Sequence, residues 1–435
     1  AIGGAIMHNL AIALSRKGYQ VTGSDDAIYD PAKTNLKKEV LLPEIGWNAS
    51  RIDKKIDFVI LGMHARKDNP ELLRAEQLGL KIMSFPEFVA AECKDKTRLV
   101  VAGSHGKTTT TAMIMHVLSK LKVDFDYLVG SSIEGFDLSV KLSNAPLIVI
   151  EGDEYLSSPL DLRSKFLWYN PNVSIITGIA YDHINVFPTF DLYIETFNSF
   201  IKTHNAKSKY FWFEDDAHLA KLASQNSTIP NATYNTPKFS VNNGLTTLYF
   251  KDKDYPLSVV GKHNLQNIEA ASMACETINI DRETFFKEIQ DFTGAGKRME
   301  KVYDKNNQIV YRDFAHSPSK LEATTEAVKE TYDNKLCAVF ELHTFSSLNK
   351  DFLPLYIDAM KAANSAIVFY NKAVFAHKKM EPLAPEYVKK CFGNVKIITE
   401  VGELEKSVNN YFAEGQNILL MSSGKFADAN FSFLD

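Results

Sequence analysis

Short apolar runs alternate with amphipathic stretches along most of the chain. Near the amino terminus, apolar positions after a glycine pair recur at helical spacing, and three runs of strand length follow. These runs are YQVTGSD at 19–25, DFVILG at 57–62 and LKIMSF at 80–85. Alternating helices and strands indicate a parallel sheet with helices on its faces. We therefore predict an α/β fold, with ligands beyond the carboxyl ends of the strands.

A second unit with the same alternation begins near Thr97. TRLVVAG, GSHGKT and TTTAMIMHVLSKL follow one another as strand, loop and amphipathic helix. Two further apolar runs, LIVIEGDE at 147–154 and VSIITGIAYDH at 173–183, are predicted to be buried strands that end in ionisable residues. Residues 208–261 lack a helical period and indicate an antiparallel addition.

A third unit starts around GAGKRME at 294–300, where apolar runs again alternate with helical stretches. The predicted strands are QIVYRDF at 308–314, LCAVFELH at 336–343, SAIVFY at 365–370, VKIIT at 395–399 and NILLMSS at 417–423. A chain of 435 residues agrees with about three domains. We place them at 1–96, 97–295 and 296–435.

The composition narrows the classes of partner. A net charge of -4 without a long basic run gives no reason to expect nucleic acid or an anionic membrane. The four cysteines are far apart and form no CxxC pair, so we expect neither a disulfide framework nor a zinc knuckle, and we expect a cytoplasmic location. No apolar run approaches the roughly 20 residues that span a bilayer. The opening AIGGAIM reads as the turn after a missing strand.

The GSHGKT loop carries the clearest chemical signal. Backbone N–H groups at a helix start can bind phosphate oxygens, while Lys107 adds positive charge and Thr108 offers a hydroxyl to Mg²⁺. The strict P-loop pattern would place a glycine where Val101 stands, and the nearest glycine is Gly103. A chance Gly-Lys-Thr in a simple turn is the alternative. The position between an apolar strand and an amphipathic helix favours nucleotide phosphate binding.

Two neighbouring strands are predicted to end at the edge where this loop lies. Mg²⁺ prefers oxygen ligands, and Glu151 supplies a carboxylate there, with Asp153 and Glu154 close by in the chain. His183 follows the next strand, and because imidazole rarely binds Mg²⁺ it suggests a second metal position. An acidic surface loop and an ordinary packing histidine are the alternatives.

Weaker signals lie elsewhere. Asn264 and Asn267 are three residues apart at a helix start, where their amides could read a base or where Asn264 could simply cap the helix. Arg298, Asp313 and His316 fall near a domain junction, where closing domains could bring them over a nucleotide. At the amino-terminal sheet, the expected ligand edge carries Ser24, Asp25 and His64.

Taken together, these stretches resemble the Mur ligase family, the ATP-dependent amide-forming enzymes of peptidoglycan assembly and recycling. The family signatures stand in order as GSHGKTTTT, EGDEY, YDHINVF, GKHNLQNIEAA, GAGKRME, RDFAHSP and MSSGKF. EGDEYLSSPLDLRSKFLWYNP and MSSGKF resemble the murein peptide ligase branch more than the UDP-N-acetylmuramate:L-alanine ligase branch. The resemblance implies a Rossmann-like UDP-sugar domain, a central P-loop-type ATPase domain and a Rossmann-like carboxyl-terminal domain that closes over both.

The resemblance also implies roles for residues of these motifs. The catalytic set would be Lys107, Glu151, His183 and Arg298, with Thr108 and Glu151 on one Mg²⁺ and His183 on a second. ATP would meet Gly103, Ser104, His105, Gly106, Lys107, Thr108 and Thr109 through its phosphates, Asn264 and Asn267 through adenine, Arg298 through the phosphates and Asp313 through the ribose. His316 would belong to the same ATP-binding set. Gly3, Gly4, Ser24, Asp25, His64 and Asn69 would line the uridine diphosphate site, and 343–346, beginning with His343, would meet the amine.

The sequence departs from the family pattern at three places. Ala1 and Ile6 stand where glycines are usual, and Ser317 replaces a second histidine. Some family members carry a carbamylated lysine, but no lysine occurs between His183 and Lys202, so we expect that device to be absent.

The resemblance implies a ligase that joins UDP-N-acetylmuramate to the amine of a murein tripeptide through an acyl phosphate. L-alanine is the alternative amine, and we expect a monomer or weak homo-oligomer. A different class, an NTP-hydrolysing switch, is disfavoured because NKAV at 371–374 lacks the aspartate of a guanine-reading motif.

Overall fold

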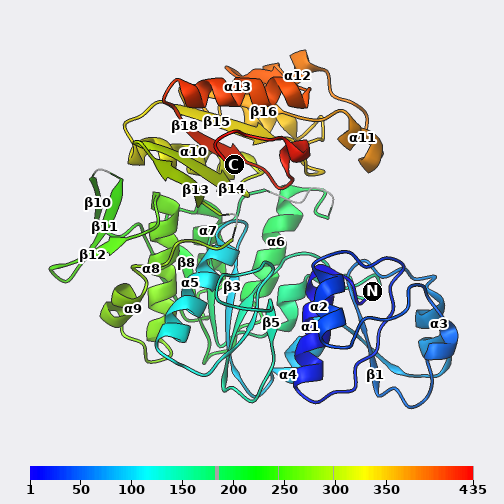
Figure 1. The fold of residues 1–435 in the computed structure, drawn as a ribbon. Helices are drawn as coiled ribbons and strands as arrows, with labels where there is room; N and C mark the ends of the chain where they lie inside the picture. The colour runs from blue at the N-terminus through cyan, green and yellow to red at the C-terminus, as the bar shows by residue number, and fades with distance from the viewer. Residues whose placement is uncertain (182–185, 243, 297, 435) are drawn as a thin grey trace.

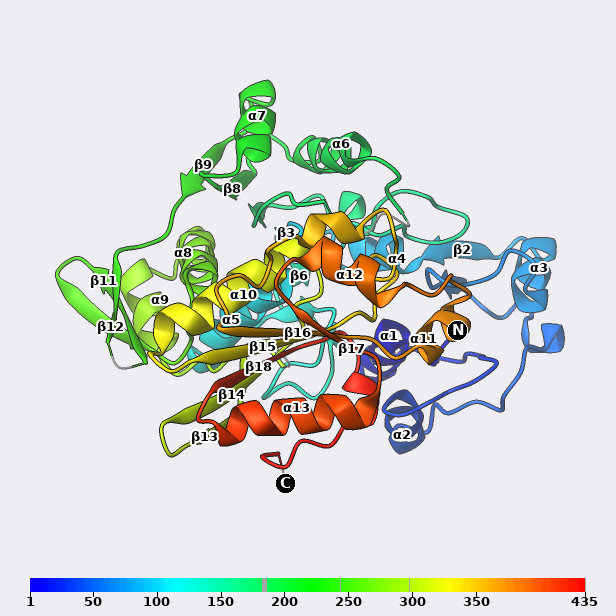
Figure 2. The same ribbon diagram turned by 90° about the horizontal axis from the view of Figure 1, so that it is seen from above.

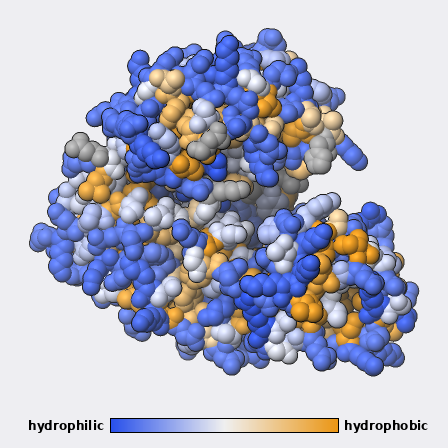
Figure 3. Space-filling model, viewed as in Figure 1, coloured by the Kyte–Doolittle hydropathy of each residue, from blue (hydrophilic) through white to orange (hydrophobic). Residues whose placement is uncertain are grey.

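The computed structural model describes residues 1–181, 186–242, 244–296 and 298–434. The chain forms three α/β bodies, which confirms the predicted fold class. The amino-terminal body lies beside the central one, and the carboxyl-terminal body sits above it (Figure 1). Figure 3 shows the surface hollowed between the amino- and carboxyl-terminal bodies.

The amino-terminal body has a two-stranded parallel sheet. Its elements are α1 (Ala5–Arg16), α2 (Ala32–Lys38), β1 (Phe58–Leu61), α3 (Pro70–Gln77), β2 (Lys81–Ser84) and α4 (Phe85–Glu92). Both later strand predictions are confirmed, but the strand predicted at 19–25 is wrong. That segment is held by a backbone bond from Ile2 N to Ser24 O, and without a ladder of such bonds an extended segment is not a strand.

The central body is built on a seven-stranded sheet in the order β5-β4-β6-β3-β7-β8-β9, parallel except for the β4–β5 pair. The strands are β3 (Thr97–Ala102), β4 (Asp126–Leu128), β5 (Val140–Lys141), β6 (Leu147–Glu151), β7 (Val173–Ile176), β8 (Lys209–Phe213) and β9 (Asn231–Tyr234). β3 lies between β6 and β7, so the phosphate loop that follows β3 emerges in the middle of the sheet edge.

Helices cover both faces of this sheet. Successive side chains of β3 point to opposite faces, so they belong to two different hydrophobic cores. Leu99 and Val101 pack against α5 (Lys107–Lys120) and α8 (Lys262–Glu276). Val100 and Ala102 belong to the opposite core with α4 and α6 (Phe190–Ile201). α7 (Ala217–Gln225) and α9 (Arg282–Glu288) complete the body.

Two predictions for the central body need correction. The strand predicted over 173–183 ends at Ile176. After it the chain leaves the sheet and crosses the phosphate loop, where Gly178 O accepts the Ser104 amide at 2.9 Å. The segment 208–261 is antiparallel only from β10 (Phe239–Asn242) through β11 (Leu245–Phe250) to β12 (Lys253–Leu257), because its first part forms β8, α7 and β9.

The carboxyl-terminal body contains a six-stranded sheet in the order β13-β14-β18-β15-β16-β17. Its five predicted strands are confirmed as β14 (Gln308–Asp313), β15 (Leu336–Glu341), β16 (Ser365–Phe369), β17 (Lys396–Ile398) and β18 (Asn417–Met421). An additional antiparallel strand, β13 (Glu300–Lys305), pairs with β14. The helices are α10 (Pro318–Thr331), α11 (Ala373–Lys378), α12 (Pro385–Phe392) and α13 (Val401–Ala413). Seen from above, α10 lies over the central body (Figure 2).

In the part of the chain that the structure describes, no helix combines the length and apolar character needed to cross a membrane. All four cysteines are buried as free thiols.

Candidate active site

Two glycines shape the phosphate loop between β3 and α5. Gly103 has φ +127°, and a Cβ there would lie 2.1 Å from the hydroxyl oxygen of Thr177. Gly106 has φ +72°, and its Cβ would lie 2.6 Å from the amide oxygen of Asn267. Both positions therefore require glycine, for backbone conformation and for space. Val101 is still within β3 and fully buried, so the loop turns only after it.

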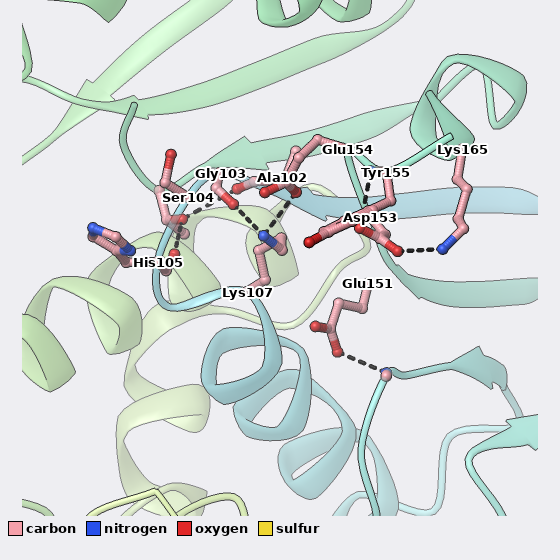
Figure 4. Close-up of polar contacts among 12 residues, drawn as sticks. Ala102, Gly103, Ser104, His105, Lys107, Glu151, Asp153, Glu154, Tyr155 and Lys165 are labelled. Atoms are coloured by element: carbon pink, nitrogen blue, oxygen red, sulfur yellow. Dashed lines mark hydrogen bonds and ion pairs between the residues drawn. The ribbon is translucent and has the colours of Figure 1, made fainter. Parts of the chain in front are cut away.

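Lys107, at the first position of α5, lies in the middle of this site (Figure 4). Its Nζ donates to Gly103 O at 2.6 Å and to Glu154 Oε2 at 2.8 Å. Burial lowers the pKa of this lysine, but the charge and hydrogen bond of Glu154 outweigh burial, so the pKa is raised overall. Lys107 is therefore a protonated, largely buried cation at the phosphate loop.

Thr108 and Glu151 meet beside the lysine. The Thr108 hydroxyl donates to Glu151 Oε1 at 2.8 Å, and the other Glu151 oxygen accepts the amide of Gly130 at 2.8 Å. A hydroxyl and a carboxylate side by side fit Mg²⁺, which takes oxygen ligands and keeps several waters. Among the described residues, no group of three or more His, Cys, Asp or Glu could form a fuller metal site.

Asp153, also expected near the phosphates, faces away from Lys107. Its Oδ2 accepts Lys165 Nζ at 2.5 Å, as Figure 4 shows. Glu154, rather than Asp153, is the acidic residue that pairs with Lys107. Tyr193 of α6 also donates to Glu154, at Oε1 and 3.0 Å, and no sequence motif pointed to this contact.

The carboxyl-terminal body contacts the loop directly. Arg298 Nη2 donates to the Thr108 hydroxyl at 3.2 Å, and its guanidinium lies 5.3 Å from the ring centre of Phe314. His105 Nε2 is 2.6 Å from the hydroxyl oxygen of Ser319 in α10. Ser319 was missed because a single serine in a helix carries no functional signal.

Asn264 and Asn267 are both buried in the first turns of α8. The alternative that Asn264 caps the helix is wrong, because Gly261 is the N-cap and Asn264 Nδ2 donates back to Val260 O at 2.8 Å. Asn267 lies against Gly106 of the phosphate loop.

Asp313, at the end of β14, is tied to the Arg298 segment. Its carboxylate accepts the amides of Met299 at 2.6 Å and Ala315 at 2.7 Å. Burial raises the pKa of Asp313, against the lowering effect of these hydrogen bonds. His316 contacts its own turn, with Nδ1 2.8 Å from Phe314 O.

Of the residues expected at the UDP-sugar site, Gly3, Gly4, Ser24 and Asp25 lie together in the amino-terminal body. Gly3 N donates to Asp25 Oδ2 at 2.8 Å, next to Gly4, the N-cap of α1. The Ser24 hydroxyl donates to Glu71 Oε1 at 2.7 Å. Asn69 caps α3, and His64 is exposed.

His343 follows β15 and begins the loop expected to meet the amine. Its backbone amide donates to the Ser347 hydroxyl at 3.1 Å, and its Nδ1 lies 3.4 Å from the Ser423 hydroxyl oxygen, after β18. The stretches 343–346 and MSSGKF therefore share one edge of the sheet. The remaining candidate, His183, lies outside the described residues.

Comparison with known proteins gives three family matches along the chain. "Mur ligase family, catalytic domain" matches 1–97, "Mur ligase middle domain" matches 101–275, and "Mur ligase, glutamate ligase domain" matches 297–424.

Two kinds of curated relative are similar to the chain. It is 31% identical over 382 residues to a UDP-N-acetylmuramate–L-alanine ligase of Caldicellulosiruptor saccharolyticus, covering 84% of this chain and 82% of the relative. It is 27% identical over 459 residues to a UDP-N-acetylmuramate–L-alanyl-gamma-D-glutamyl-meso-2,6-diaminoheptandioate ligase of Haemophilus influenzae. This match covers 99% of this chain and 97% of the relative.

Solved structures of both kinds share the fold. A murein peptide ligase from Psychrobacter arcticus aligns with a TM-score of 0.67 and 23% identity, covering 99% of this chain and 96% of the other. A UDP-N-acetylmuramate-alanine ligase from Thermotoga maritima aligns with a TM-score of 0.72 and 21% identity over the same shares.

Proposed function

Because this chain belongs to the Mur ligase family and is an ATP-dependent ligase of an acid and an amino acid, we propose that it joins UDP-N-acetylmuramate to a murein tripeptide. The carboxylate comes from the UDP-sugar and the amine from the peptide. The observation that carries the proposal is the meeting of Lys107, Thr108 and Glu151 at one loop, with Arg298 of the carboxyl-terminal body above them.

The phosphates of ATP bind at this loop. The amides at the start of α5 and the charges of Lys107 and Arg298 face the phosphate oxygens, where they stabilise the charge that develops during phosphoryl transfer. Asn267 lies against the loop and Asn264 within the same helix, which supports adenine contacts from α8. Asp313 accepts the amide of Met299, the residue after Arg298. This position beside the phosphate-binding arginine supports a contact between Asp313 and the ribose.

Thr108 and Glu151 would hold Mg²⁺. Held by these two residues, the ion would supply positive charge that offsets part of the charge of the phosphates. His183 stays a proposed ligand of a second metal position. The fit rests on the two oxygen ligands that already lie 2.8 Å apart.

The reaction has two steps. An oxygen of the substrate carboxylate attacks the γ-phosphorus of ATP, which forms an acyl phosphate and releases ADP. The amine then attacks the acyl carbon, the C–O bond to phosphate breaks, and an amide, inorganic phosphate and a proton result. Activation is needed because a carboxylate oxygen is a poor leaving group, whereas phosphate departs readily. Closure of the carboxyl-terminal body over the site would exclude water that hydrolyses the acyl phosphate.

The amino-terminal cluster of Gly3, Gly4, Ser24 and Asp25 supports a UDP-sugar site, with His64 and Asn69 at its border. α1 begins beside this cluster with Gly4 as its N-cap, and the free amides of a helix start are suited to binding a diphosphate. The 343–346 loop lies with MSSGKF on one sheet edge, which supports their joint contact with the amine.

L-alanine is the alternative amine, and more of the curated relatives carry the name of an alanine ligase than of a peptide ligase. The peptide is favoured by the segments 151–171 and 421–426, which resemble the peptide ligase branch.

The deciding assay incubates purified protein with ATP, Mg²⁺ and UDP-N-acetylmuramate and compares L-alanine, the tripeptide and the tetrapeptide. Phosphate release with the tripeptide but not with L-alanine is expected. Turnover with L-alanine alone would assign the chain to the alanine branch. As a test of the loop, Lys107→Ala should abolish ADP formation and leave UDP-sugar binding nearly intact.

A further inference from the structure

Lys107 does not stand alone in the phosphate loop, because a chain of hydrogen bonds connects it to Ser104 of the same loop. The chain runs through Glu154 and Tyr193. Lys107 Nζ is 2.8 Å from Glu154 Oε2, Tyr193 Oη is 3.0 Å from Glu154 Oε1, and Ser104 Oγ is 2.9 Å from Tyr193 Oη. We propose that Glu154 and Tyr193 are positioning residues that hold the Lys107 ammonium where it meets the nucleotide phosphates.

The direction of every proton in this chain is fixed. Ser104 Oγ accepts the amide of Ala180 at 2.9 Å. Tyr193 gives its single hydroxyl proton to Glu154, so the proton between Ser104 and Tyr193 comes from Ser104. Glu154, as a carboxylate, then accepts from Tyr193 on one oxygen and from Lys107 on the other. The bonds from Ala180 through Ser104 and Tyr193 to Glu154 run in one direction and therefore strengthen one another, and the Lys107 bond meets them at Glu154.

Burial makes this arrangement rigid. Glu154 and Tyr193 have no exposed surface, and the Lys107 side chain is 13% exposed. The Tyr193 ring packs edge-on against Phe187 and Phe197, with ring centres 5.0 and 5.3 Å away. Tyr193 Oη is therefore held by its ring, and it fixes Glu154 in turn.

The consequence for Lys107 is geometric. A lysine side chain is flexible, and its ammonium has three N–H groups. Gly103 O at 2.6 Å and Glu154 at 2.8 Å take two of them, which sets the direction of the third. A fixed cation interacts with phosphate without first losing rotational freedom, so binding is stronger than with a mobile one.

This inference rests on the proposed contact between Lys107 and nucleotide phosphate. The test therefore compares ATP with AMP, which lacks the β- and γ-phosphates. Dissociation constants are measured by calorimetry with full-length protein for a non-hydrolysable ATP analogue and for AMP, together with KM for ATP and for the UDP-sugar. The variants are Tyr193→Phe, which removes only a hydroxyl, Glu154→Gln, their double mutant, and Lys107→Met.

A buried hydrogen bond to a charged group predicts about a tenfold loss of ATP-analogue affinity in Tyr193→Phe and at least as much in Glu154→Gln. AMP affinity and KM for the UDP-sugar should stay within about twofold, whereas a general folding defect would lower every affinity together. Once Glu154 is neutral, the tyrosine hydroxyl has no charge to hold, so the double mutant should bind the ATP analogue as Glu154→Gln does.

The matched control is Tyr210→Phe in β8. Tyr210 is equally buried, and its hydroxyl has no hydrogen-bond partner among the described residues, so its removal should leave all constants unchanged. Unchanged ATP-analogue affinity in Tyr193→Phe and Glu154→Gln would overturn the inference, and so would tighter binding by Glu154→Gln, which would make Glu154 a competitor of phosphate. Unchanged affinity in Lys107→Met would instead overturn the phosphate-loop assignment itself.

Discussion

His105 Nε2 of the phosphate loop lies 2.6 Å from the hydroxyl oxygen of Ser319, a residue 214 positions further along the chain. The contact joins the nucleotide loop of the central body to α10 of the carboxyl-terminal body. Together with the bond from Arg298 to Thr108, it ties the position of the carboxyl-terminal body to the conformation of the loop. Domain closure and phosphate binding are therefore expected to affect each other.

Removing this contact should weaken nucleotide binding. We expect Ser319→Ala to raise KM for ATP by about threefold to tenfold, since one neutral hydrogen bond is worth about 1 kcal/mol. Steady-state kinetics with saturating UDP-sugar measures the effect. Ser224→Ala is the control, because that hydroxyl bonds only within its own surface helix, to Lys221 O at 2.7 Å. An unchanged KM in Ser319→Ala would show that the contact contributes nothing to nucleotide binding.

The phosphate loop should not tolerate a side chain at Gly103. In Gly103→Ala, the new Cβ would clash with Thr177 at 2.1 Å, so we expect a free energy of unfolding lower by about 3 kcal/mol or more and no detectable ADP formation. Gly135→Ala has the same kind of positive φ, +83°, but open space around its Cβ, so it should lose only about 1–2 kcal/mol. Denaturant unfolding gives the free energy of unfolding of each variant. The loss in Gly135→Ala measures backbone strain alone, and the additional loss in Gly103→Ala measures the clash. Equal losses would contradict the predicted clash.

Glu151 should determine the Mg²⁺ requirement. Glu151→Gln keeps the shape of the side chain but replaces a charged ligand by a neutral one, so the Mg²⁺ concentration for half-maximal activity should rise by about tenfold or more. Asp153→Asn serves as the control, because the Asp153 carboxylate pairs with Lys165 Nζ at 2.5 Å and not with Thr108. A Mg²⁺ titration of activity is the measurement. If both variants titrate like the unaltered protein, Glu151 is not a ligand.

His204 predicts a pH dependence of stability. It is buried with Nε2 2.8 Å from the Ser174 hydroxyl oxygen and Nδ1 2.9 Å from Ile201 O, and burial lowers its pKa to about 4. Between pH 6.5 and about 4 the unfolded chain binds this proton and the folded protein does not, so stability falls as the pH falls.

The loss from this residue should reach about 3 kcal/mol at the acid end of that range. Denaturant unfolding at several pH values should show a shallower decline in His204→Gln, whose side chain does not titrate there. Above pH 7 the pH dependence of the two proteins should be parallel. The same slope in both proteins between pH 6 and 4 would assign the acid sensitivity to other groups.

Most secondary structure of the second and third bodies could be predicted from the sequence, because buried parallel strands appear as compact apolar runs. The errors have physical causes. The segment 19–25 has a strand composition but no partner ladder, and β7 ends at Ile176 although apolar residues continue, because the chain turns across the phosphate loop. In 208–261, β8 and β9 join the parallel sheet and α7 lies between them, which an aromatic-rich composition did not reveal.

The sequence by itself determined the order of strand, glycine loop and helix around Lys107, because this order depends on neighbours in the chain and on the conformations that glycine alone adopts. It also placed Glu151 at the strand end where it meets Thr108. Only the tertiary structure decided that Glu154 holds the lysine, that Tyr193 holds Glu154 and that Ser319 reaches His105. These contacts depend on how α6 and α10 pack against the sheet and the loop, and hydrophobic packing is set by the whole core rather than by the residues that it brings together.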